Sequence, residues 1–72
     1  MVAKIKDITE FRQEMGRNGY SERKLSIRIK GKKYPGFINR IVHKQKTSIA
    51  SAYSISQKLN VPFEKHFELV PR

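Results

Sequence analysis

Apolar residues recur at intervals of three and four along much of this chain, which is the spacing of one face of an α-helix. The first run starts at Ile5 and continues through Ile8, Phe11 and Met15, with polar residues between them. It should end at Gly-Arg-Asn-Gly, residues 16–19, because glycine and asparagine favour the left-handed conformation that closes a helix. We therefore expect a first helix from residue 5 to about residue 16.

A second short helix is predicted to begin at Ser21. Its hydroxyl can accept a free backbone N–H, and the acidic Glu22 suits the first helical turn. Leu25 and Ile29 then share one face, whereas Ile27 points the other way, since two residues turn a helix by about 200°. This helix is expected to expose an isoleucine.

The same segment also fits a strand. Leu25, Ile27 and Ile29 alternate with polar residues, which is the period of a half-buried strand, and Lys-Gly-Lys-Lys at residues 30–33 is suited to a hairpin turn. The helical interpretation is preferred because both neighbouring segments have helical spacing.

A third helix is expected from Pro35 and Gly36 to about Gln45, because proline is tolerated in the first helical turn. A helical projection places its residues on two faces. The apolar face holds Phe37 at its border, Ile38, Ile41 and Val42, and the polar face holds Gly36, Asn39, Arg40, His43 and Lys44.

Two further helices complete the predicted architecture. Thr47 or Ser48 should cap a fourth helix ending at Asn60, and Pro62 should open a short closing helix. Their apolar stripes comprise Ile49, Ala52, Tyr53, Ser56 and Leu59 in the former and Val61, Phe63 and Phe67 in the latter. The expected fold class is all-α: a compact bundle of five short helices forming one domain over residues 1–72.

Charge changes the picture, since 16 Lys and Arg oppose six Asp and Glu. Residues 17–46 hold ten of the basic residues and one acidic residue. Such a basic block attracts polyanions such as DNA or RNA. There is no cysteine and no apolar run suited to a signal peptide or membrane span, so a cytoplasmic location is the default expectation.

The order of these helices resembles the DNA-binding domain of the lambda-repressor and Cro-like helix-turn-helix family. The strongest likeness lies in Ile-Asn-Arg-Ile at residues 38–41 and in the sequence SIASAYSISQKLNVPFEKHF at residues 48–67. The resemblance implies that the second and third helices form the helix-turn-helix motif. Eight residues separate Ile29 from Ile38, so the turn is longer than the family pattern.

The family's base-reading positions are occupied here by Pro35, Gly36 and Phe37, which cannot form the paired hydrogen bonds that distinguish base pairs. Asn39 and Arg40 could still reach base edges. Phosphate binding requires only positive charge. The candidate nucleic-acid-binding residues are therefore Lys30, Lys32, Lys33, Asn39, Arg40, Lys44 and Lys46.

An apolar patch near the same turn favours a protein partner. Ile27, Tyr34 and Phe37 would be surrounded by basic residues, a composition typical of protein interfaces, although a core position for Phe37 and a scattered surface position for Ile27 are the simpler alternatives. The glycine at position 36 would allow another backbone to approach. The candidate protein-interface residues are Ile27, Arg28, Tyr34, Gly36, Phe37, Asn39 and Arg40.

Within the helix-turn-helix family, such a short basic chain resembles the small switch proteins of temperate phages, in particular the modulators of repression (antirepressors) of lactococcal phages. That resemblance implies a partner, the DNA-binding domain of a cognate repressor, in the cytoplasm of a host bacterium. The basic residues add the expectation of weak DNA binding with little sequence preference. Two alternatives remain: a Cro-like dimeric repressor that binds operator DNA directly through Asn39, Arg40 and Lys44, and a small RNA or ribosome binder.

Catalytic and metal-binding patterns are missing from the sequence. His43 and His66 lack a carboxylate-rich neighbourhood and are expected at the surface or at helix ends. No Ser-His-Asp set or glycine-rich phosphate loop is recognisable. The chain is therefore not expected to be an enzyme or to bind a metal, a cofactor or a small-molecule substrate.

Overall fold

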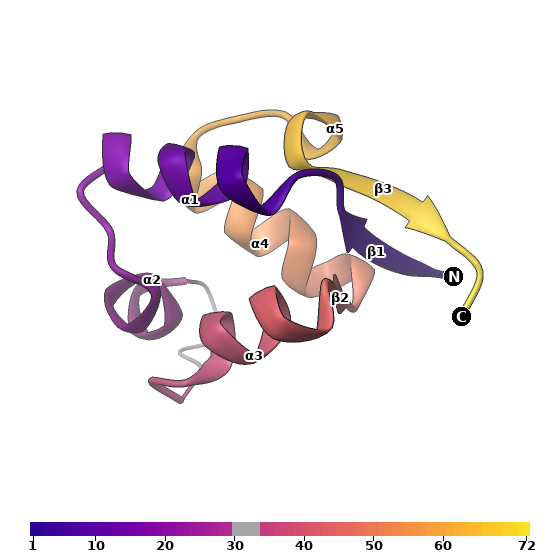
Figure 1. Cartoon of the computed structure of the whole chain (residues 1–72), viewed down its shortest axis with the longest axis horizontal. Coiled ribbons are helices and arrows are strands. Elements are labelled where there is room, and N and C mark those ends of the chain that lie inside the picture. The colour runs from indigo at the N-terminus through magenta and orange to yellow at the C-terminus, as the bar shows by residue number, and fades with distance from the viewer. Residues whose placement is uncertain (30–33) are drawn as a thin grey trace.

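A computed structural model of the chain describes residues 1–29 and 34–72, and it combines helices with a sheet (Figure 1). The described residues form five helices and a three-stranded antiparallel sheet, so the expected all-α fold class is wrong. The elements in order are β1 (Val2–Ile5), α1 (Ile8–Arg17), α2 (Glu22–Arg28), α3 (Phe37–Lys44), β2 (Lys46–Thr47), α4 (Ile49–Leu59), α5 (Phe63–His66) and β3 (Phe67–Val70).

The sheet joins the two ends of the chain, with strands in the order β2-β1-β3. Ile5 of β1 lies opposite Phe67 of β3, and Ala3 of β1 lies opposite Thr47 of β2. Figure 1 shows β1 and β3 side by side at one end of the molecule, with both termini there. The two ends of the chain are therefore hydrogen-bonded to each other, and all five helices lie between them in sequence.

Two predicted helical residues, Ile5 and Phe67, are instead strand partners. The spacing from Ile5 to Ile8 fits a helix, but Asp7 interrupts it, because its carboxylate accepts the Glu10 N–H at 3.1 Å as the N-cap of α1. The β1–β3 ladder satisfies the extended backbone of both chain ends. The prediction failed because this pairing is not local.

The helix ends follow the predicted chemistry more closely. Ser21 and Ser48 each accept a backbone N–H three residues ahead, at 3.1 Å and 3.2 Å, and so cap α2 and α4. Asn60 closes α4 in the left-handed conformation, and Gly19 follows α1 with a φ of 75°. These assignments confirm a helix, at residues 22–28, where the alternative expected a strand. The strand interpretation is therefore wrong, and the turn expected at residues 30–33 lies outside the described residues.

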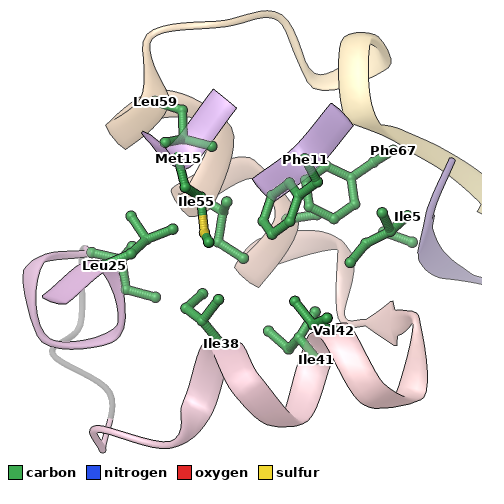
Figure 2. Close-up of a cluster of buried hydrophobic side chains, with 13 residues drawn as sticks. Ile5, Phe11, Met15, Leu25, Ile38, Ile41, Val42, Ile55, Leu59 and Phe67 are labelled. Atoms are coloured by element: carbon green, nitrogen blue, oxygen red, sulfur yellow. The ribbon is translucent and has the colours of Figure 1, made fainter. Parts of the chain in front are cut away.

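The core lies between the helices and the inner face of the sheet (Figure 2). Ile38, Ile41 and Val42 point from α3 towards side chains of α1 and α4, as predicted. In α4 the stripe differs from the prediction, since Tyr53 is exposed and Ile55 is buried. The buried apolar residues are Ala3, Ile5, Phe11, Met15, Leu25, Ile29, Ile38, Ile41, Val42, Ala52, Ile55, Leu59 and Phe67.

A polar cluster centred on the buried side chains of Glu14 and His66 connects α1 with α5. Glu14 Oε1 lies 2.7 Å from Lys65 Nζ, 3.1 Å from His66 Nε2 and 3.2 Å from Arg17. Hydrogen bonds from Lys65, His66 and Arg17 lower the pKa of the Glu14 carboxyl from 4.5 to about 2, although its burial acts in the opposite direction. His66 was expected at the surface or at a helix end. It does lie at the end of α5, but its side chain is buried and not at the surface.

Candidate protein and nucleic-acid interface

One buried serine positions α3 against α2. Ser26 is fully buried, its Oγ accepts the Ile38 N–H at 2.9 Å, and its hydroxyl donates to the Glu22 carbonyl at 2.8 Å. The Ile38 N–H belongs to the first turn of α3, where backbone donors have no partner within the helix. The side chain of Ser26 therefore sets the position at which α3 starts.

The start of α3 carries the aromatic residues that the sequence singled out. The Phe37 N–H donates to the Tyr34 carbonyl at 3.0 Å, and the two rings meet edge to face at a centroid distance of 5.9 Å. Tyr34 is 52% exposed, whereas Phe37 is partly buried against the core. The core interpretation of Phe37 is therefore partly right, and its role at a protein interface stays a prediction.

Gly36 does not need the conformational freedom of glycine. Its φ is −87°, and an added Cβ would meet the Tyr34 ring at an ordinary contact distance of 3.6 Å. The suggested close approach of another backbone therefore has no support from the geometry at this position.

Asn39 is already engaged within the molecule. Its amide donates to Glu22 Oε1 at 3.0 Å, and Arg12 Nε lies 3.6 Å from the other carboxylate oxygen of Glu22. Paired recognition of adenine requires both the amide N–H and the amide oxygen in a fixed orientation. Asn39 would have to leave Glu22 to offer that arrangement freely.

A surface hollow of about 240 Å³ lies between the outward side of α3 and β2, and we name it the α3–β2 hollow. Arg40 and Lys44 stand one helical turn apart along it, and Lys46 comes from β2. Arg40 also reaches the Tyr34 hydroxyl, at a long distance of 3.5 Å. The lining residues, which include no acidic residue, are Tyr34, Phe37, Arg40, Ile41, Lys44, Lys46 and Thr47.

The structure brings together residues from both candidate sets. Tyr34, Phe37 and Arg40 were predicted at a protein interface, and Arg40, Lys44 and Lys46 at a nucleic-acid interface, yet all five line one hollow. A single surface therefore combines aromatic rings and positive charge. This union depends on β2, which was not predicted.

Other candidate residues lie elsewhere. Ile27 is 45% exposed on α2, as expected. Arg28 lines a separate hollow with Ser54, Gln57 and Lys58 of α4. Lys30, Lys32 and Lys33 fall outside the described residues.

Sequence reasoning did not connect Glu22 with Asn39, and it missed Ile41 and Thr47 as lining residues of the α3–β2 hollow. Glu22 was interpreted only as an acid in the first turn of α2, since nothing in the sequence connects it with Asn39. Ile41 contributes to the hollow although most of its side chain lies in the core. Thr47 was considered only as a helix cap.

A second hollow, of about 410 Å³, lies beside β3 at the opposite end of the sheet from β2. Tyr53 stacks on Phe63 at a centroid distance of 4.6 Å, and Leu69 is 48% exposed. Its other lining residues include Glu64 and Glu68 against a single basic residue, Lys6. Aromatic side chains line both hollows, but among the described lining residues the charged groups are all basic in the α3–β2 hollow and mixed in the second hollow.

The described residues contain neither a metal-binding cluster nor a membrane-spanning helix. Among residues 1–29 and 34–72, no three His, Cys, Asp or Glu side chains are grouped so as to hold a metal ion. Within the same ranges, no helix has the length and apolar character needed to cross a membrane.

Comparison with known proteins gave no match: no protein-family model fits the chain, and no curated protein or solved structure is significantly similar to it.

Proposed function

We propose that the protein is a small genetic-switch regulator that binds the DNA-binding domain of a cognate repressor and blocks or retargets the binding of that repressor to its operator. It has weak, sequence-independent affinity for DNA of its own. The resemblance to phage switch proteins suggests the partner. The observation that carries the proposal is the contact between Asn39 and Glu22 at the start of α3.

The first turn of α3 is poorly suited to reading a DNA sequence. Gly36 and Phe37 offer no side-chain hydrogen bond to a base edge, and Asn39 is held by Glu22. Arg40 remains as a group that could contact guanine. One arginine gives little discrimination over a site of several base pairs, so selectivity must come from another molecule.

A protein partner suits the mixed character of this surface. Tyr34 is half exposed, Phe37 is partly buried behind it, and Arg40 stands beside both. Tyrosine and arginine are the residues that most often dominate the energy of protein interfaces. Because the face is basic, the repressor surface that meets it is expected to carry acidic groups.

Weak DNA binding would use Arg40, Lys44 and Lys46, which are grouped without an acidic neighbour in the hollow. Phosphate contacts of this kind position a protein on DNA without selecting a sequence. They would strengthen a ternary complex of regulator, repressor and operator.

The test is capture of the partner from nuclease-treated lysate of cells carrying the parent replicon, followed by reconstitution with the purified repressor and its operator. We expect the regulator to abolish or shift the operator complex. Tyr34→Ala should weaken the protein complex at least tenfold. Tyr53→Ala is a matched control, because Tyr53 is equally exposed but lies outside the α3–β2 hollow. Equal effects of the two variants would contradict the proposed interface.

The alternative is a Cro-like repressor that binds its operator as a dimer. The observation in its favour is β3, which lies at an edge of the sheet and exposes Leu69, and so offers a surface to a second copy. Selection of duplexes from a random pool, with sedimentation of the free protein, distinguishes the two functions. Enrichment of one palindromic site by a dimer would establish the alternative and reject the primary proposal.

A further inference from the structure

We infer that the α3–β2 hollow binds one unpaired nucleotide, so that the protein holds single-stranded nucleic acid with the base inside the hollow and the flanking phosphates on its cationic rim. This goes beyond the proposed function and does not depend on it, since no repressor takes part.

The aromatic wall gives the hollow a surface on which a base can stack. Tyr34 is 52% exposed and is supported from behind by the Phe37 ring in an edge-to-face contact. A ring held in this way loses little further freedom when a base covers it. Stacking on aromatic side chains tolerates any base, because every base has a π-face.

The charges around the hollow suit a phosphate backbone. Arg40 and Lys44 are one turn apart on α3, and Lys46 continues the positive charge onto β2. Among the hollow's lining residues none is acidic, so an anion meets no opposing charge there. A cationic groove beside an aromatic platform is the arrangement used by proteins that bind single strands.

The second hollow shows why aromatic residues alone are insufficient. Tyr53 and Phe63 are stacked on each other, and Glu64 and Glu68 line the same hollow. These carboxylates would repel phosphate groups. The combination of an accessible ring and unopposed cations occurs at the α3–β2 hollow.

An unpaired nucleotide fits this hollow better than a base pair does. The hollow has a volume of about 240 Å³, and a stacked base pair presents only its edges to a protein. The start of α3 is poor in groups that read such edges, whereas the residues lining the hollow include the aromatic Tyr34 and the hydroxyl-bearing Thr47. An unpaired base can use both.

The test measures binding of fluorescent ten-nucleotide probes to the full chain: oligothymidine, oligouridine, an abasic DNA strand of equal charge, and a ten-base-pair duplex. We expect oligothymidine to bind about 5- to 30-fold more tightly than the abasic strand, because only the former can stack. Oligothymidine should also bind more tightly than the duplex. Comparison with oligouridine shows whether DNA or RNA is preferred, and either preference fits the inference.

Tyr34→Ala should reduce oligothymidine affinity about 5- to 30-fold and leave affinity for the abasic strand unchanged. Tyr34→Phe, which retains the ring, should bind like the unchanged protein. Tyr53→Ala is the matched control, because Tyr53 is 51% exposed but lies outside the α3–β2 hollow. Folding should survive in both Tyr34 variants, since the Phe37 N–H is bound by the backbone carbonyl of residue 34, which each substitution retains. It should also survive in Tyr53→Ala, because that side chain is half exposed.

Three results would each overturn the inference: equal affinity for oligothymidine and the abasic strand, tighter binding of the duplex, or equal losses in Tyr34→Ala and Tyr53→Ala. Displacement of oligothymidine by polyglutamate of equal charge as effectively as by unlabelled oligothymidine would also reject it, because the hollow would then bind any polyanion. None of these outcomes bears on whether a repressor is captured.

Discussion

Two buried serines in this protein differ in what their hydroxyls do. Ser26 links the backbone of α2 to the first turn of α3, whereas Ser56 Oγ is buried in α4 without a hydrogen-bond partner among the described residues. Removing a hydroxyl costs free energy of folding when it leaves a buried partner unsatisfied, and little when the hydroxyl has no partner. Substitution by alanine should therefore destabilise the protein at Ser26 but not at Ser56.

Ser26→Ala should lower the free energy of unfolding by about 1–3 kcal/mol, because it leaves the buried Ile38 N–H without its acceptor. Ser56→Ala should be neutral or stabilising, since it removes a polar atom that has no partner among the described residues. Urea unfolding of both variants measures the difference. A larger loss in Ser56→Ala would show that Ser26 does not fix α3.

Glu14 predicts a pH dependence of stability. Its pKa is lowered from 4.5 to about 2 in the folded protein, so the unfolded chain binds a proton at a higher pH than the folded one does. The resulting stabilisation, on the order of 3 kcal/mol, is fully present above about pH 4.5 and is lost as the pH falls towards 2.

Glu14→Gln should remove most of this pH dependence and should lower stability at pH 7, because Lys65 and Arg17 lose their charged partner. Thermal unfolding between pH 2 and pH 7 measures both effects. As a control, Glu68→Gln changes the charge equally on the exposed part of β3 and should leave the profile nearly intact. A variant that keeps the original profile would contradict the assignment to Glu14.

At the scale of elements, β3 is buried at its beginning and exposed towards its end. Phe67 is buried and meets the Phe11 ring edge to face at 5.9 Å, whereas Leu69, two residues further along, is 48% exposed. Residues two apart in a strand share a face. The difference in their burial shows that the helices cover only the first part of β3.

Phe67→Ala should therefore reduce the free energy of unfolding by about 3–5 kcal/mol, enough to unfold much of so small a domain. Leu69→Ala should cost under about 1 kcal/mol, because about half of the leucine side chain is already exposed to water in the folded protein and little apolar burial is lost. Circular dichroism with chemical unfolding distinguishes the two variants. Similar losses would mean that the end of β3 is as well packed as its beginning.

The predictability of each element depends on how local its interactions are. The caps at Ser21, Ser48 and Asn60 act within a few residues, and each was recognised in the sequence. The β1–β3 pair has four-residue strands from opposite ends of the chain, and neither strand has enough alternation to be recognised alone. The missed sheet changed the fold class.

The candidate site divides in the same way. Arg40 and Lys44 were assigned to one face of a helix by their spacing, which the structure confirms at the α3–β2 hollow. The Asn39–Glu22 contact joins α3 to α2, which are separated by residues 29–36 in the sequence. It could not be predicted from either segment alone.

For the whole molecule, a net charge of +10 makes binding to any polyanion sensitive to salt. Its charged side chains are distributed unevenly. The basic residues Arg40, Lys44 and Lys46 line the α3–β2 hollow, whereas the acidic residues Glu64 and Glu68 line the second hollow. This asymmetry gives the protein a preferred side for anions.

The double variant Arg40→Gln/Lys44→Gln should reduce the slope of log affinity against log salt for random duplex DNA by about 2, since each phosphate contact contributes about 0.9. Lys58→Gln/Arg72→Gln removes the same charge outside the hollow and should reduce the slope much less. Binding titrations at several salt concentrations test this. Equal reductions would show that net charge, and not the hollow, governs DNA binding.

The sequence by itself determined that five helices form and roughly where, the caps at Ser21, Ser48 and Asn60, the apolar face of α3 and the concentration of positive charge in the middle of the chain. Each of these depends on interactions among neighbouring residues or on composition alone. Only the tertiary structure decided that the chain ends pair in a sheet, that His66 is buried beside Glu14, and that β2 completes a hollow with α3. Those features require contacts between distant segments, whose free energy depends on the burial and hydrogen bonding of both partners together.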